Sequence, residues 1–174
     1  GTPAHCGVAK NVDILTGTLG KALGGGMGGY ICASKDVVHL LRNRARPYLF
    51  SNALTPALLG ATLKTIELVR NGGALREQLF RNATRFRQQM TEAGFDLLPG
   101  EHPIIPIMIY DARKAAQLAD ELMEEGVYVT AFSFPVVPKE KARIRTQMCA
   151  GHSDDQVDTA VAAFVKAGKK IGVI

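Results

Sequence analysis

The chain has 174 residues, of which 47% are hydrophobic and 21% charged, proportions that are ordinary for a globular protein or a piece of a larger one. The formal net charge of +5 comes from basic residues scattered along the chain, which gives no reason to expect nucleic-acid binding. No apolar run approaches the length that spans a bilayer, and we recognise no secretory signal peptide. Three widely spaced cysteines without a CxxC pair predict a reducing compartment and no zinc site.

The first part of the chain predicts two strands, a glycine-rich connection and a short helix. The strands are expected over 12–15 and 29–33. The connection holds five glycines in the six positions 24–29. Apolar spacing predicts a helix over 35–44, and 46–52 is expected to be non-helical.

The second part predicts helices and strands that together form an α+β layer. Thr55 followed by Pro56 is a typical helix start, and Gly72 should end that helix. A further helix is expected up to Gly94, with an apolar stripe at Leu75, Leu79, Ala83, Phe86 and Met90. Strands are then predicted over 103–110, 127–131 and 142–148, and helices from Asp111 to about Glu125 and from a Ser153–Gln156 capping box onward.

The glycine-rich segment matches two nucleotide-binding patterns only in part. Gly20 and Lys21 could end a Walker A loop, but Ala22 replaces the required hydroxyl residue. The run 24–29 fits GxGxxG, but no amphipathic helix follows it and no acidic residue stands at the expected distance. Lys21 could instead be a nucleophile, because a lysine held in a dry pocket can present a neutral amine to an aldehyde. The alternative is an exposed lysine in a glycine loop.

The string Thr-Leu-Gly-Lys-Ala-Leu-Gly-Gly over 18–25, followed by Gly-Gly-Tyr over 28–30, resembles the lysine motif of the α-oxoamine synthases. These are fold-type-I enzymes that depend on pyridoxal 5'-phosphate (PLP). The resemblance extends over the whole chain. The segments that resemble the glycine C-acetyltransferase type of this family are 44–52, 104–108, 134–139 and 142–148.

The resemblance implies a fold and a domain organisation. The expected fold is α/β, the C-terminal part of an aspartate aminotransferase-like PLP-dependent transferase. Residues 1–60 would form the end of the large PLP-binding domain, and residues 61–174 the small α+β domain. The family's ring-stacking histidine and its aspartate for the pyridine nitrogen would precede residue 1. We therefore expect the isolated chain to be inactive.

The resemblance also gives single residues their roles. Lys21 matches the catalytic lysine that forms a Schiff base with PLP, and Thr18 matches a ligand of the cofactor phosphate. Ser51 and Asn52 match the pair that reaches the PLP phosphate of the other subunit of a homodimer. Arg145 matches the arginine that binds the substrate carboxylate, for which a guanidinium fork is well suited.

One of these residues also has a simpler interpretation. Arg145 could be a strand residue in a surface salt bridge, and strand alternation puts Arg143 on the same face. Cys149 is expected to be a small buried residue.

The function implied is the condensation of glycine with acetyl-CoA to 2-amino-3-ketobutyrate and CoA, a step of threonine degradation. The expected location is the cytoplasm, or the mitochondrion in a eukaryote. Two alternatives remain open at this point. One is another α-oxoamine synthase, of the 8-amino-7-oxononanoate or 5-aminolevulinate synthase type. The other is a non-catalytic fragment that serves dimerisation or ligand binding.

Overall fold

The computed structural model describes residues 1–24 and 26–174, so Gly25 of the lysine motif lies outside the described residues. The chain divides into two compact units, Gly1–Gly72 and Gly73–Ile174. The boundary expected from the sequence lies near residue 60, whereas in the structure the helix that starts at Pro56 belongs wholly to unit 1. The assignment of these units to the large and small domains of the family stays a prediction.

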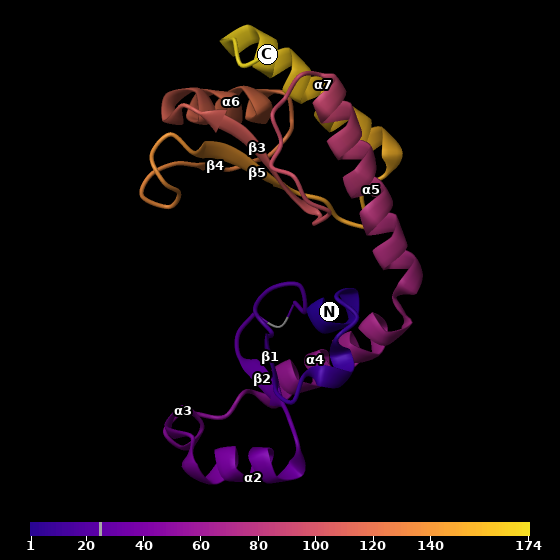
Figure 1. The fold of residues 1–174 in the computed structure, drawn as a ribbon, viewed down its shortest axis with the longest axis vertical. Helices are drawn as coiled ribbons and strands as arrows, with labels where there is room; N and C mark the ends of the chain where they lie inside the picture. The colour runs from indigo at the N-terminus through magenta and orange to yellow at the C-terminus, as the bar shows by residue number, and fades with distance from the viewer. Residues whose placement is uncertain (25) are drawn as a thin grey trace. The chain divides into compact units, whose positions relative to one another are not determined.

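Unit 1 contains a hairpin of two antiparallel strands, β1 (Leu15–Thr18) and β2 (Gly29–Cys32) (Figure 1). The prediction of β2 is confirmed, but the strand expected over 12–15 begins only at Leu15, because the pairing with β2 starts there. Gly17 lies opposite Tyr30, and a Cβ atom at Gly17 would lie 2.3 Å from the Tyr30 ring carbon Cζ. The Tyr30 ring therefore requires glycine at this position of the hairpin.

The helices of unit 1 follow the hairpin. Helix α2 (Lys35–Arg44) has its predicted bounds, and α4 (Pro56–Asn71) begins as predicted after Thr55, whose hydroxyl accepts a hydrogen bond from the backbone N–H of Leu58. The expectation that 46–52 is non-helical is wrong, because α3 (Arg46–Leu49) forms there with a proline in its first turn. Two further short elements open the chain, α1 (Thr2–His5) and the 3-10 helix η1 (Ala9–Asn11).

Unit 1 has almost no hydrophobic core of its own. Leu19, 2% exposed, is the only buried residue among those that the structure describes in this unit. Many large apolar side chains of the unit are exposed instead, and this leaves an apolar surface that other protein could cover. Those most exposed are Met27, Leu40, Tyr48, Phe50, Leu63 and Leu68.

Unit 2 is built on a three-stranded antiparallel sheet with the strand order β3-β5-β4 (Figure 1). Strands β3 (Ile104–Tyr110) and β5 (Ala142–Gln147) agree with the prediction, and alternate residues of β5 are buried. The strand expected over 127–131 is mostly absent, since β4 covers only Ala131–Phe132. The backbone N–H of Val127 donates instead to the carbonyl of Leu122 and so closes the end of the preceding helix.

Three helices pack with the sheet of unit 2 and enclose its core (Figure 1). They are α5 (Gly73–Glu92), α6 (Ala112–Glu124), capped by Asp111, and α7 (Asp154–Ile171). Leu75, expected in the apolar stripe of α5, is exposed. No helix in the described part of the chain is long and apolar enough to cross a membrane. The largest core side chains are Phe86, Met90, Ile105, Ile107, Leu118, Leu122, Ile144 and Phe164.

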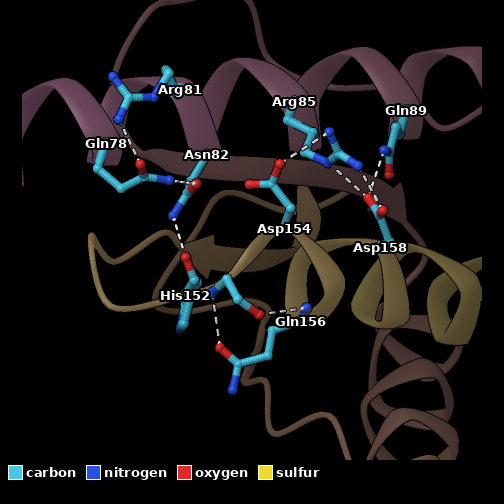
Figure 2. A network of polar contacts seen from close by, with 10 residues as sticks. Gln78, Arg81, Asn82, Arg85, Gln89, His152, Asp154, Gln156 and Asp158 are labelled. Carbon is cyan, nitrogen blue, oxygen red and sulfur yellow. Dashed lines mark hydrogen bonds and ion pairs between the residues drawn. The ribbon is translucent and has the colours of Figure 1, made fainter.

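A buried amide fastens α5 to the turn before α7 (Figure 2). The side chain of Asn82 donates hydrogen bonds to the carbonyls of Cys149 and His152, each at 2.9 Å. The capping box of Ser153 and Gln156 is formed as predicted. Cys149 itself is exposed, contrary to the expectation of a buried thiol. Its carbonyl accepts from Asn82, and its Sγ accepts a hydrogen bond from the backbone N–H of Gly151 at 3.3 Å, so the residue belongs to the surface turn and not to the core.

An ion-pair cluster joins helices α5 and α7 (Figure 2). Arg85 donates two hydrogen bonds to the carboxylate of Asp158, at 2.8 and 2.6 Å, and Gln89 donates a third at 2.7 Å. Asp154 lies 3.5 Å from the same guanidinium. The hydrogen bond from Arg85, followed by that from Gln89, lowers the pKa of Asp158 to about 2.

Candidate active site

The candidate site in unit 1 is the turn that leaves β1. Leu19 is buried, and its backbone N–H donates to the carbonyl of Gly28 at 3.0 Å. Thr18 and Lys21, both exposed, lie on either side of this anchor. The burial of Leu19 thus fixes the start of the turn while the two polar side chains remain accessible.

The hydroxyl of Thr18 already has one partner within the turn. The backbone N–H of Gly20 donates to Thr18 Oγ1 at 3.2 Å. A hydroxyl can accept hydrogen bonds and donate one. Thr18 can therefore still donate its own hydrogen to an anionic oxygen, as a ligand of a phosphate must.

The backbone at Lys21 closes the turn and leaves the side chain unused. The carbonyl of Lys21 accepts a hydrogen bond from the N–H of Gly24 at 2.9 Å. No hydrogen bond or ion pair joins the Lys21 amine to another residue in the described part of the chain. The amine is exposed, as in the alternative interpretation of a lysine in a glycine loop, and this chain does not enclose it in the dry pocket that was expected. It is accessible for reaction with a carbonyl group.

The segment that carries Ser51 and Asn52 lies next to the same hairpin. Gly28 has a φ of +88°, and a Cβ atom there would lie 2.8 Å from Leu54 Cδ2. The Leu54 side chain therefore packs against the start of β2. Ser51 and Asn52 are both exposed, and no hydrogen bond between either of them and Lys21 is present among the described residues. The structure thus brings their segment to the hairpin but does not join them to the lysine.

Arg145 belongs to unit 2, where it is exposed on β5. Its guanidinium carbon lies 4.4 Å from the centroid of the Phe132 ring. Arg143 differs, because its Nε donates to the carbonyl of Lys141 at 2.9 Å. Arg145 is also one of the residues around a pocket of about 590 Å³, together with Gln147 and His152.

Three residues that lie near the candidate site residues were not identified from the sequence. Leu19 and Leu54 fix the backbone on either side of the glycine-rich turn, and Phe132 lies against Arg145. The sequence carries no signal for Phe132, because its pairing with Arg143 and its contact with Arg145 join two strands that lie apart in the chain.

The available groups fit PLP chemically. A free amine at Lys21 suits the cofactor's aldehyde, and the hydroxyl of Thr18 suits its phosphate. The guanidinium of Arg145 suits the carboxylate of an amino acid. No group of three or more His, Cys, Asp or Glu side chains that could hold a metal ion occurs in the described part of the chain.

Comparison with known proteins gives matches over nearly the whole chain. The model of the family described as aminotransferase class I and II matches residues 1–164. The 2-amino-3-ketobutyrate coenzyme A ligase of Escherichia coli (strain K12) is 55% identical over 174 residues, which are 100% of this chain and 44% of that protein. The mitochondrial 2-amino-3-ketobutyrate coenzyme A ligase of Homo sapiens is 45% identical over 100% of this chain and 42% of its own length.

Two further matches widen the comparison. The 8-amino-7-oxononanoate synthase of Thermosipho melanesiensis is 42% identical over 98% of this chain and 43% of its own length. The solved structure of Sphingomonas wittichii serine palmitoyltransferase superposes with a TM-score of 0.93 at 31% identity, over 100% of this chain and 44% of that one. These matches confirm the expected α/β transferase fold. The chain spans less than half the length of these relatives, and which part of them it represents stays a prediction.

Proposed function

This chain belongs to the aminotransferase class I and II family, and we propose on this basis that it is part of a PLP-dependent acyltransferase that condenses glycine with acetyl-CoA. The products are 2-amino-3-ketobutyrate and CoA. The observation that carries the proposal is the accessible Lys21 amine beside Thr18, in a chain similar along its whole length to 2-amino-3-ketobutyrate coenzyme A ligases.

Lys21 has two tasks in this proposal. Its amine holds PLP, which when bound supplies an electron sink for the charge that develops on the substrate carbon. When it is not bonded to the cofactor, the free Lys21 amine would take a proton from the glycine Cα. Cα would then form a bond to the acetyl carbon while the C–S bond of the thioester breaks, and the proton held by Lys21 would pass to the departing sulfur, so that CoA leaves as the thiol.

The other proposed site residues bind and orient. Thr18 donates its hydroxyl hydrogen to the cofactor phosphate, and Arg145 holds the carboxylate of glycine through two parallel hydrogen bonds. Ser51 and Asn52 reach the phosphate of the other subunit in a homodimer. The proposed location is the cytoplasm, or the mitochondrion in a eukaryote.

The acyl substrate is tested by release of free CoA from the full-length protein. With glycine as acceptor, acetyl-CoA should give the highest kcat/KM in a series of acyl-CoA thioesters of increasing length. Alanine and serine should replace glycine poorly. No release of CoA with glycine and acetyl-CoA would contradict the proposal.

The second candidate is an α-oxoamine synthase with another acyl-CoA or amino acid. The similarity to 8-amino-7-oxononanoate synthase supports it. The same series decides between the two, because this candidate predicts the highest kcat/KM with a longer acyl chain or with an amino acid other than glycine.

A further inference from the structure

Phe132 and Arg145 share one face of the sheet in unit 2. Phe132 pairs with Arg143 in the antiparallel register of β4 and β5, and Arg145 follows two residues later on the same face. Of the four cation–ring contacts in the described part of the chain, the contact of Arg145 with Phe132 is the shortest, at 4.4 Å against 5.3–5.7 Å for the others.

The contact with Phe132 leaves the donors of Arg145 free. The N–H groups of a guanidinium lie in its plane and point outward from its edge. Cation–π attraction to Phe132 holds the guanidinium without a hydrogen bond, and no hydrogen bond or ion pair of the Arg145 side chain is present in the described part of the chain. Arg143, by contrast, uses its Nε for the carbonyl of Lys141. Arg145 is therefore the arginine of β5 that is both held and able to bind a carboxylate with its edge.

The ring itself has a fixed place. Phe132 is half-buried and lies in β4, paired with the central strand β5. The next residue begins a turn in which the carbonyl of Ser133 accepts hydrogen bonds from Val136 and Val137, at 2.9 and 3.2 Å. Strand pairing before the turn and hydrogen bonds within it limit the movement of the backbone that carries the ring.

We propose that Phe132 is a positioning residue, which holds the guanidinium of Arg145 in the orientation that binds the substrate carboxylate. This inference rests on the proposed function, in which Arg145 binds glycine. Phe132 itself does not touch the reacting atoms, so it affects the reaction through the affinity for the amino acid and not through proton transfer.

The test uses the full-length protein loaded with PLP and the variants Phe132→Leu and Phe132→Tyr. Phe132→Leu should raise KM for glycine roughly tenfold, with kcat and the KM for acetyl-CoA little changed. Phe132→Tyr retains a ring and should behave as the wild type. Phe134→Leu is the matched control, because Phe134 is an exposed ring nearby that contacts Lys139 and not an arginine.

Binding measured without turnover separates positioning from a general loss of structure. Glycine and glycinamide, which lacks the carboxylate, are titrated against the visible absorbance of PLP. Phe132→Leu should weaken the binding of glycine and leave the binding of glycinamide unchanged. In a protein that already carries Arg145→Gln, Phe132→Leu should weaken glycine binding no further. Equal weakening of both ligands, a further effect in that background, or failure of Phe132→Tyr to restore binding would overturn the inference.

The wild-type protein distinguishes failure of the inference from failure of the proposed function. If it shows no PLP absorbance, or binds glycine no better than glycinamide, the proposed function and the inference both fail. If it prefers glycine and Phe132→Leu keeps that preference, only the inference fails.

Discussion

The turn after β1 presents two side chains of different chemistry from a short stretch of backbone. The hydroxyl of Thr18 accepts from Gly20 and retains its own hydrogen, while the amine of Lys21 has no partner in the described part of the chain. Both depend on Leu19, whose burial and hydrogen bond to Gly28 fix the backbone between them. The turn therefore combines a backbone anchored at Leu19 with two accessible polar groups.

Replacement of the Thr18 hydroxyl tests its proposed bond to phosphate. In the full-length protein, Thr18→Val keeps the shape of the side chain and should weaken PLP binding by roughly tenfold, since one hydrogen bond to a charged group is lost. Thr16→Val is the control, because Thr16 lies on the same face of β1 but outside the turn. The dissociation constant of PLP, measured by absorbance after the cofactor is removed and added back, should be unchanged in the control; an equal effect in both variants would contradict the proposed role.

Single residues could be predicted where a local string of sequence carried the information. Thr18 and Lys21 were proposed as site residues in this way; the structure shows both exposed, and their roles stay predictions. Phe132 could not be found, because its importance depends on a contact with Arg145 across two strands. Leu54 was missed for the same reason, since it meets Gly28 from a distant part of unit 1.

At the scale of elements, helix starts were predicted well and strands less well. Thr55, Asp111 and Ser153 each bind backbone N–H groups a few residues onward, so the signal is local. A strand depends on its partner, which lies elsewhere in the sequence. For this reason the strand expected over 12–15 lies instead at Leu15–Thr18, where it pairs with β2, and most of 127–131 is not a strand.

The ion-pair cluster between α5 and α7 predicts a pH-dependent stability. The pKa of Asp158 is lowered from its ordinary value of 3.8 to about 2 in the folded chain. Its ionised form therefore stabilises the fold above about pH 4, and this contribution is lost as the pH falls towards 2. Asp158→Asn should lower the free energy of unfolding at neutral pH, and its difference from the wild type should shrink below pH 4.

Urea unfolding of the chain at a series of pH values measures this effect. Asp120→Asn is the control, because Asp120 is an exposed carboxylate on α6 with no ion pair in the described part of the chain. A pH-independent effect of Asp158→Asn, or an equal effect of the control, would show that the cluster does not stabilise the fold as described.

The core of unit 2 predicts that two phenylalanines of α5 contribute very differently to the free energy of unfolding. Phe86 is fully buried and meets Phe164 edge to face, with ring centroids 6.0 Å apart. Phe86→Ala should lower the free energy of unfolding by about 3–5 kcal/mol, through lost burial and the cavity that remains. Phe80, on the same helix, is 43% exposed, so Phe80→Ala should cost much less. Equal losses in denaturant unfolding would contradict this description of the core.

At the scale of the whole molecule, the two units differ in how they bury apolar side chains. Unit 2 encloses a core between its sheet and helices, whereas unit 1 buries only Leu19 among its described residues. Helix α4 shows the contrast, since its Leu63 is 71% exposed. Surfaces of this kind usually mark an interface with other protein.

We therefore expect the 174-residue chain to self-associate. Sedimentation velocity should show species larger than a monomer at micromolar concentration. Leu63→Lys, which places a charge on the exposed face of α4, should shift the distribution towards the monomer. A single monomeric species of the wild-type chain across the concentration range would contradict the expectation.

The isolated chain is also expected to be inactive, because it spans less than half the length of the relatives that it matches. Turnover of glycine with acetyl-CoA by the 174-residue chain alone would show this expectation to be wrong.

The most direct test concerns the bond between Lys21 and PLP. The full-length protein is incubated with PLP, reduced with borohydride and digested, and the labelled peptide is identified by mass spectrometry. We predict a reduced phosphopyridoxyl group on Lys21 and its absence in Lys21→Ala. A label on another lysine, such as Lys10 or Lys35, with Lys21 unmodified, would contradict the proposed active site.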